Sequence, residues 1–139
     1  SYCDFCKMYY NKELSNIYLD YLEKEIDMYY EGDTVKTIYV GGGTPSSLDT
    51  DNLNKLFRII NKFKISSDAE FTFECNIDDI NDELLTILKE NHVSRISIGV
   101  ESFNKDKLKY LNRNHNKKEI FNNISLVKKY GFNKWNTKY

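Results

Sequence analysis

Residues 37–47, TIYVGGGTPSS, decide the fold that we expect of this chain. An apolar, β-branched run ends at three consecutive glycines, and Thr44 and Pro45 then turn the chain. Glycines lack a Cβ, so they tolerate unusual φ/ψ and let a ligand approach bare backbone. Pro45 fixes its own φ and biases Thr44 toward an extended conformation, which stiffens the turn. The stretch predicts a strand ending in backbone donors that hold a small polar ligand; a tight strand-to-helix connection is the alternative.

The composition indicates one globular domain and excludes several classes of function. A chain of 139 residues is long enough for a genuine core, and 29% charged with 40% hydrophobic residues is ordinary for a soluble protein. A net charge of -1 gives no overall field that would attract nucleic acid or an anionic membrane. No apolar run approaches the roughly 20 residues of a membrane span, and no signal peptide opens the chain. Three cysteines, an odd and sparse count, favour a reducing, intracellular setting.

Apolar spacing predicts helices that alternate with strands. Helices are expected over 14–29, 53–63, 84–88 and 120–127, and strands over 35–40, 69–75 and 95–101. Asp49 or Thr50 is expected to cap the second helix and Asn81 the third. Five tyrosines are interpreted as helix-face or core residues: Tyr9, Tyr10, Tyr29, Tyr30 and Tyr39.

This alternation predicts an α/β fold with a parallel sheet, either an open doubly wound sheet or part of a barrel. In the strand 69–75, Phe71 and Phe73 share one face while Thr72 and Glu74 share the other. A parallel open sheet is apolar on both faces, so one polar face favours a TIM-like (βα) barrel with outer helices. Such barrels place their sites at the C-terminal ends of the strands. We therefore expect the three glycines, Glu74 and Glu101 to lie on one rim.

Several polar residues are candidate ligand contacts. Glu74 and Glu101 end successive strands with acceptor-only carboxylates suited to hydroxyls or an amino group; solvated charge, or a glycosidase-like acid/base pair, is the alternative. Arg113, in the loop LNRNHN, has a guanidinium group that can donate two hydrogen bonds to a carboxylate; the alternative is a solvated surface charge. Cys3 and Cys6 have the spacing of metal ligands, yet a zinc site needs four ligands and an iron–sulfur cluster three or four thiolates.

Five segments occur in an order that resembles radical S-adenosylmethionine (SAM) enzymes: SYCDFCK, GGGTPSSL, TFECN, RISIGVESFN and LNRNH. The specific resemblance is to oxygen-independent coproporphyrinogen III oxidases and their haem-chaperone relatives, and it covers essentially the whole chain. It implies that residues 1–139 are part of a single radical SAM core domain, a partial TIM-like barrel whose first and C-terminal strands lie outside this sequence. In such enzymes three cysteines hold a 4Fe–4S cluster, and SAM chelates the fourth iron.

The resemblance implies roles for particular residues. Cys3 matches the third cluster cysteine, and Tyr2 the aromatic residue before it, near the adenine of SAM. The segment that pairs with the methionine moiety matches Gly41, Gly42, Gly43 and Thr44. Glu74 and Arg113 match residues that contact the cofactor, and Glu101 stands where the family commonly has glutamine. The first two cluster cysteines would precede Ser1, Cys6 is a poor substitute for them, and residues 133–139 stop near where a further strand is expected.

For the function, the resemblance implies oxidative decarboxylation of coproporphyrinogen III by way of a 5′-deoxyadenosyl radical. The alternatives are a haem chaperone that delivers haem to a partner, or an inactive truncated fragment. The implied partners are a porphyrinogen or haem and an electron donor such as flavodoxin or ferredoxin. The implied location is the cytoplasm, or an organelle if a transit peptide precedes Ser1.

Overall fold

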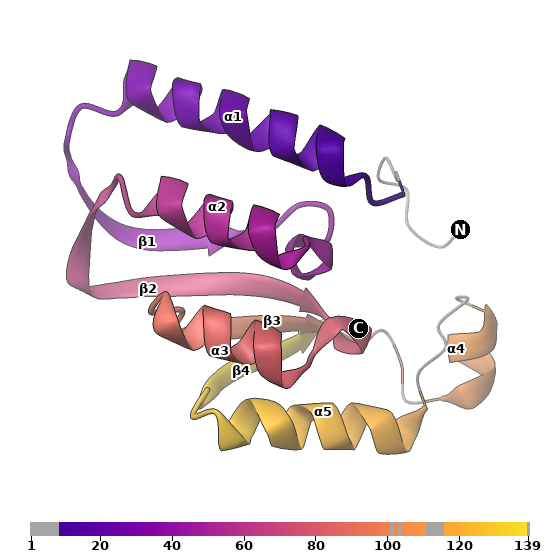
Figure 1. Ribbon diagram of the computed structural model, residues 1–139. Coiled ribbons are helices and arrows are strands. Elements are labelled where there is room, and N and C mark those ends of the chain that lie inside the picture. The colour runs from indigo at the N-terminus through magenta and orange to yellow at the C-terminus, as the bar shows by residue number, and fades with distance from the viewer. Residues whose placement is uncertain (1–8, 101, 103, 111–115, 139) are drawn as a thin grey trace.

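Four parallel strands form one sheet in the order β1-β2-β3-β4. The computed structural model describes residues 9–100, 102, 104–110 and 116–138. The strands are β1 (Thr34–Val40), β2 (Lys64–Asn76), β3 (Arg95–Gly99) and β4 (Lys134–Lys138). The helices are α1 (Lys12–Tyr29), α2 (Thr50–Ile60), α3 (Asp82–Glu90), α4 (Lys105–Tyr110) and α5 (Lys117–Lys129), with short 3-10 turns η1 (Pro45–Ser47) and η2 (Ile77–Asp79). The predicted parallel α/β fold is confirmed (Figure 1).

Short polar side chains begin the helices, as the sequence leads one to expect. Asp49 accepts a hydrogen bond from the Asn52 amide and Asn81 one from the Leu84 amide, so both predicted caps are confirmed. Asn116 starts α5 with a capping box in which the Glu119 side chain accepts from the Asn116 amide. These caps satisfy backbone donors that each first turn leaves unpaired. The strand-to-helix connections are therefore fixed locally.

The sheet has one face covered by helices, which we call the helix-covered face. Phe73, Ile96 and Ile98 are fully buried there, against apolar side chains of α2, α3 and α5. Phe73 stacks on Phe57 of α2 with ring centroids 5.8 Å apart. Figure 1 shows α2, α3 and α5 lying along the strands on this side, while α4 lies beyond the ends to which the strand arrows point. The core of the domain is this helix–sheet interface.

The opposite face carries mainly polar side chains, and we call it the polar face. Because Glu74 pairs with Ser97 in register, and Thr72 with Arg95, these four side chains share one face. Arg95 forms an ion pair with Glu70 at 3.1 Å toward the start of the strands. The predicted separation into one apolar and one polar face is confirmed.

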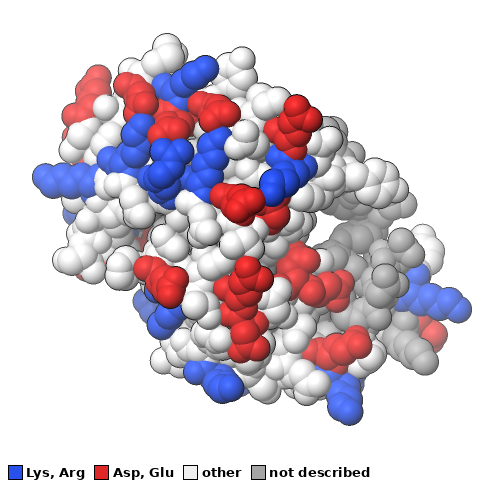
Figure 2. All heavy atoms as spheres, in the orientation of Figure 1, with Lys and Arg blue, Asp and Glu red and all other residues white. Residues whose placement is uncertain are grey.

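The first helix is attached in a way that the apolar spacing does not predict. Leu19 is the buried residue of α1, whereas Leu14, Tyr18 and Tyr29 are exposed. Ion pairs also hold this helix: Lys55–Asp20 at 2.6 Å and Arg58–Glu23 at 3.0 Å join it to α2, and Lys62–Asp27 at 2.5 Å joins it to the turn after α2. Figure 2 shows these acidic and basic side chains gathered where α1 and α2 lie.

Two elements extend the prediction. β4 runs parallel to β3 where the sequence indicated that a further strand would begin, and its Trp135 pairs with Ile96 in register. α4 was not predicted from the sequence, and its Leu108 is buried. Within the described residues, no helix is both long and apolar enough to cross a membrane.

Candidate cofactor site at the ends of β1 and β2

The glycine-rich loop leaves the C-terminal end of β1 and leads through η1 into α2. Ser47 closes the turn, because its Oγ donates to the Thr44 carbonyl at 2.6 Å and its amide donates to the same oxygen at 2.9 Å. Ser46 ties the loop to β2: its Oγ donates to Asp79 at 2.6 Å and accepts from the Asn76 amide at 2.9 Å. The loop is therefore held at both strands.

The three glycines differ in what requires them. A Cβ on Gly41 would lie 2.7 Å from Cε1 of Tyr39 and 3.0 Å from Cδ of Glu74, so no larger residue fits without a shift. Gly42 has φ +114, a conformation that L side chains rarely adopt. Gly43 meets neither restriction, since a Cβ there would find nothing within 4 Å. Sterics within the protein account for Gly41, and the backbone at Gly43 is left open to a ligand.

The Glu74 carboxylate lies over this loop from the polar face of β2. Its Oε1 accepts a hydrogen bond from the Tyr39 hydroxyl at 2.5 Å. Its Oε2 lies 3.1 Å from the point where a Gly41 Cβ would stand. The predicted meeting of the glycine loop with Glu74 is confirmed at Gly41, where the carboxylate supplies hydrogen-bond acceptors.

Ser97 adds a polar atom beneath Glu74 on the same face. Its side chain is only 2% exposed, and its Oγ has no hydrogen-bond partner among the described residues. A buried hydroxyl without a partner is unfavourable, and such groups gather at functional sites. Neither Ser97 nor Ser46 was a candidate from the sequence, although Ser46 lies within GGGTPSSL and Ser97 within RISIGVESFN.

Tyr39 is the third residue that the sequence reasoning missed. We interpreted it as a packing residue, but 59% of its side chain is exposed and its hydroxyl binds Glu74. Tyr39 is two positions before Gly41, and residues two apart in a strand share a face. This spacing would have placed Tyr39 on the same face as the candidate site. Three other tyrosines assigned to packing are also exposed: Tyr9, Tyr10 and Tyr29. Tyr30 is half-buried and packs edge-on against Phe63, as expected.

Four of the predicted contacts lie outside the described residues: Tyr2, Cys3, Glu101 and Arg113. Cys6 lies outside them as well. Within the described part of the chain, no group of three His, Cys, Asp or Glu residues is placed to hold a metal ion. Cys75 is buried on the helix-covered face, and desolvation raises the pKa of its thiol, which disfavours the thiolate that a metal would need. The described residues suit an organic ligand with a positive group.

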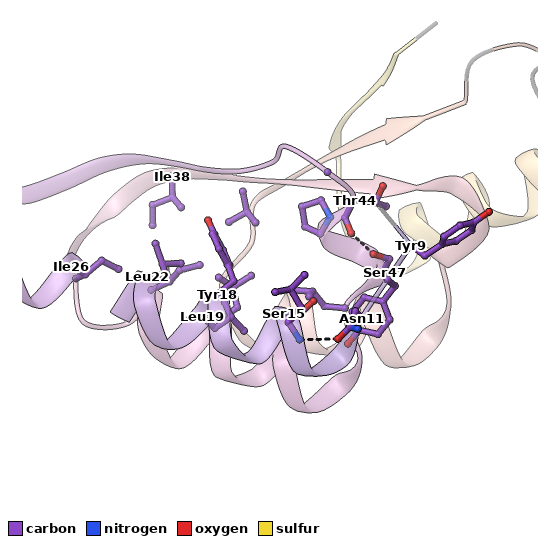
Figure 3. A pocket seen from close by; sticks show the side chains of 18 of the residues that line it. Tyr9, Asn11, Ser15, Tyr18, Leu19, Leu22, Ile26, Ile38, Thr44 and Ser47 are labelled. Atoms are coloured by element: carbon purple, nitrogen blue, oxygen red, sulfur yellow. Dashed lines mark hydrogen bonds between the residues drawn. The ribbon is translucent and has the colours of Figure 1, made fainter. Parts of the chain in front are cut away.

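A groove of about 570 Å³ lies on the other side of the loop, between α1 and β1. Figure 3 shows Leu19, Leu22 and Ile26 of α1 facing Ile38 of β1, with Thr44 and Ser47 at one end. Because Ile38 neighbours Phe71 in register, the groove opens on the helix-covered side of the sheet. Its lining is mostly apolar, which does not suit the charged amino-acid end of SAM. The polar face is the better site for that ligand.

The fold and site define a parallel α/β protein with a glycine-rich loop at the carboxyl end of its first strand. The model of the radical SAM superfamily matches residues 1–139. The chain is 41% identical over 136 residues to the haem chaperone HemW of Bacillus subtilis, covering 94% of this chain and 36% of that protein. It is 31% identical over 123 residues to the oxygen-independent coproporphyrinogen III oxidase of Escherichia coli, covering 86% of this chain and 27% of that protein. This chain belongs to the radical SAM superfamily.

A solved structure agrees with this assignment. The coproporphyrinogen III oxidase HemN from Escherichia coli, a radical SAM enzyme, superposes with a TM-score of 0.85 at 28% identity, covering 93% of this chain and 31% of that one. The expected partial TIM-like barrel is thus confirmed. The chain spans about a third of the length of the curated relatives it matches. Membership implies a 4Fe–4S cluster and SAM as the cofactors general to the superfamily.

Proposed function

We propose that the protein carrying this chain binds SAM at the ends of β1 and β2. The observation that supports this most strongly is the Glu74 carboxylate, which lies against Gly41 at the start of the glycine loop. A carboxylate accepts hydrogen bonds from an ammonium group, and open backbone gives a flat surface on which the methionine moiety can lie. Ser46 and Ser47 keep the loop in place before the ligand arrives. This preorganisation reduces the entropy lost on binding.

The cluster ligands belong to the same proposal. Cys3, which lies outside the described residues, is the candidate thiolate, with Tyr2, Glu101 and Arg113 as further cofactor contacts. A bound and reduced 4Fe–4S cluster would supply the electron for reductive cleavage of SAM. The residues described here bind and orient the cofactor, and the barrel wall excludes water from it. Residues 1–139 would then form part of one radical SAM core domain.

For the whole protein, we propose oxidative decarboxylation of coproporphyrinogen III, with an electron donor such as flavodoxin or ferredoxin. The superposition on the coproporphyrinogen oxidase HemN supports this candidate. The second candidate, a haem chaperone that binds haem and passes it to a partner, is favoured by the higher identity to HemW proteins, 41% against 31%. Both candidates use the same SAM site, and both suit a cytoplasmic protein.

The test uses the full-length protein, reconstituted with iron and sulfide and reduced without oxygen. SAM binding is measured by calorimetry, and 5′-deoxyadenosine by chromatography. Glu74→Gln should weaken SAM binding by about tenfold or more, because a neutral amide replaces the charged acceptor. Glu90→Gln, which changes an exposed carboxylate on α3, is the control and should leave binding unchanged. Wild-type protein that neither binds nor cleaves SAM would overturn the proposal.

Two assays on the same preparation distinguish the oxidase from the chaperone. Release of CO₂ from coproporphyrinogen III, with one 5′-deoxyadenosine formed per carboxylate lost, supports the oxidase. Haem bound one to one, with no turnover of coproporphyrinogen, supports the chaperone.

A further inference from the structure

Tyr39 occupies an unusual position for an aromatic residue. It lies on the polar face of β1, pairs in register with Thr72, and is 59% exposed, so burial does not explain it. Its hydroxyl reaches across to the neighbouring strand and donates to Oε1 of Glu74 at 2.5 Å. A hydrogen bond to an ionised acceptor is roughly twice as strong as one between neutral groups. The contact is therefore strong enough to fix where the carboxylate points.

Gly41 completes this arrangement. The Tyr39 ring and the Glu74 carboxylate approach the same point, 2.7 Å and 3.0 Å from where a Gly41 Cβ would stand. The backbone registers explain the meeting, because Val40 pairs with Phe73 and the next residues along the two strands are Gly41 and Glu74. The absent side chain at Gly41 leaves the space into which Tyr39 holds the carboxylate.

We propose that Tyr39 is a positioning residue that holds Glu74 in its cofactor-binding orientation; this inference rests on the proposed SAM site. A glutamate side chain loses rotamer freedom when it binds a ligand, and that loss weakens binding. The Tyr39 hydroxyl anchors Oε1, so Glu74 already has its bound orientation in the free protein. Tyr39 acts through Glu74 and need not touch SAM.

The test is a double-mutant cycle on SAM affinity in the reconstituted full-length protein, with calorimetry as the readout. Tyr39→Phe keeps the ring against Gly41 and removes the hydroxyl, so it should raise the Kd for SAM about five- to tenfold. In the Glu74→Gln background the same substitution should change the Kd less than about twofold, because the amide lacks the charge that the hydroxyl orients. The unfolding midpoint should stay unchanged, since the side chain is largely exposed.

Tyr29→Phe is the matched control, because Tyr29 is an exposed tyrosine of α1 on the other side of the sheet. It should leave the Kd unchanged. A Tyr39→Phe protein with wild-type affinity, or with an equal loss in both Glu74 backgrounds, would overturn the positioning role and leave the SAM site standing. Wild-type protein that fails to bind SAM would overturn the site and this inference together.

Discussion

The two faces of the sheet use neighbouring residues of the same strands for different purposes. On the helix-covered face, Phe73 is fully buried and stacks on Phe57. One residue further along β2, on the polar face, Glu74 accepts a hydrogen bond from Tyr39 and lies against a glycine. Apolar contacts on the first face hold the domain together, and directional polar contacts on the second arrange the proposed binding site.

This difference shows how the polar face of a strand can change its residues while the buried face keeps the fold. Successive side chains of a strand point to opposite faces of the sheet, so residues for stability and residues for binding alternate along it. Substitutions on the two faces should then separate: one set lowers the free energy of unfolding, and the other lowers affinity for the cofactor.

The largest expected effect lies on the helix-covered face. Phe73→Ala should lower the free energy of unfolding by about 3–5 kcal/mol, because it leaves a cavity beneath α2. Urea unfolding of the protein measures this. Phe121→Ala, at an exposed position of α5, is the control and should cost less than about 1 kcal/mol. Equal losses for the two substitutions would contradict the assignment of Phe73 to the core.

The glycine loop offers the next test. Gly41→Ala should raise the Kd for SAM about ten- to a hundredfold, since the new methyl group displaces Glu74 or Tyr39, and overpacking should also lower stability by about 1–3 kcal/mol. Gly43→Ala meets nothing in the protein, so it should raise the Kd while leaving the unfolding midpoint unchanged. Calorimetry and thermal melts distinguish the two. A Gly43→Ala protein that binds SAM normally would remove the proposed ligand approach at that residue.

Two buried serines sharpen the comparison further. Ser46→Ala should destabilise the protein by about 1–3 kcal/mol, because the Asn76 amide loses its acceptor and Asp79 a donor. Ser97→Ala should be neutral or stabilising by up to about 1 kcal/mol, because its Oγ has no partner in the described structure. Denaturant unfolding without cofactor measures both. Losses of equal size would show that Ser97 has a structural hydrogen bond after all.

The smallest effect concerns Cys75 on the helix-covered face. Burial raises the pKa of its thiol above the ordinary value of 9.0, so the folded state retains a proton that the unfolded state loses. Stability should therefore fall as the pH rises above about 9, with a slope approaching 1.4 kcal/mol per pH unit from this group. Unfolding measured from pH 8 to 10.5 tests this, and Cys75→Ala should flatten the curve. An equal slope in both proteins would assign the loss to other groups.

The sequence predicted most of the parallel α/β arrangement because strand alternation and helix caps are local properties. The strands near β1, β2 and β3 were found, with Asp49 and Asn81 as caps. For α1 the apolar spacing predicted the helix, but it did not single out Leu19 as the buried residue. β4 contains a single large apolar residue, Trp135, and depends on pairing with β3, which is not a local signal.

For the site, the sequence and the family resemblance placed Gly41 with Glu74, which the structure confirms. They did not find the contact between Tyr39 and Glu74. That contact depends on how β1 and β2 pair, and the register between them shifts between Val35 and Thr37. A strand irregularity of this kind decides which side chains meet, and it leaves no clear mark in either strand alone.

The ion pairs between α1 and α2 make the attachment of the first helix depend on pH. Since Leu19 is the one fully buried residue of α1, local opening of this helix should require less free energy than opening the sheet. Hydrogen bonds from Arg58, then Lys62, lower the pKa of Glu23, so the attachment is complete at neutral pH and weakens as the pH falls through the acidic range. α1 is therefore expected to exchange its amide hydrogens as a separate cooperative unit. Opening of α1 would then leave folded the strands that carry the proposed SAM site.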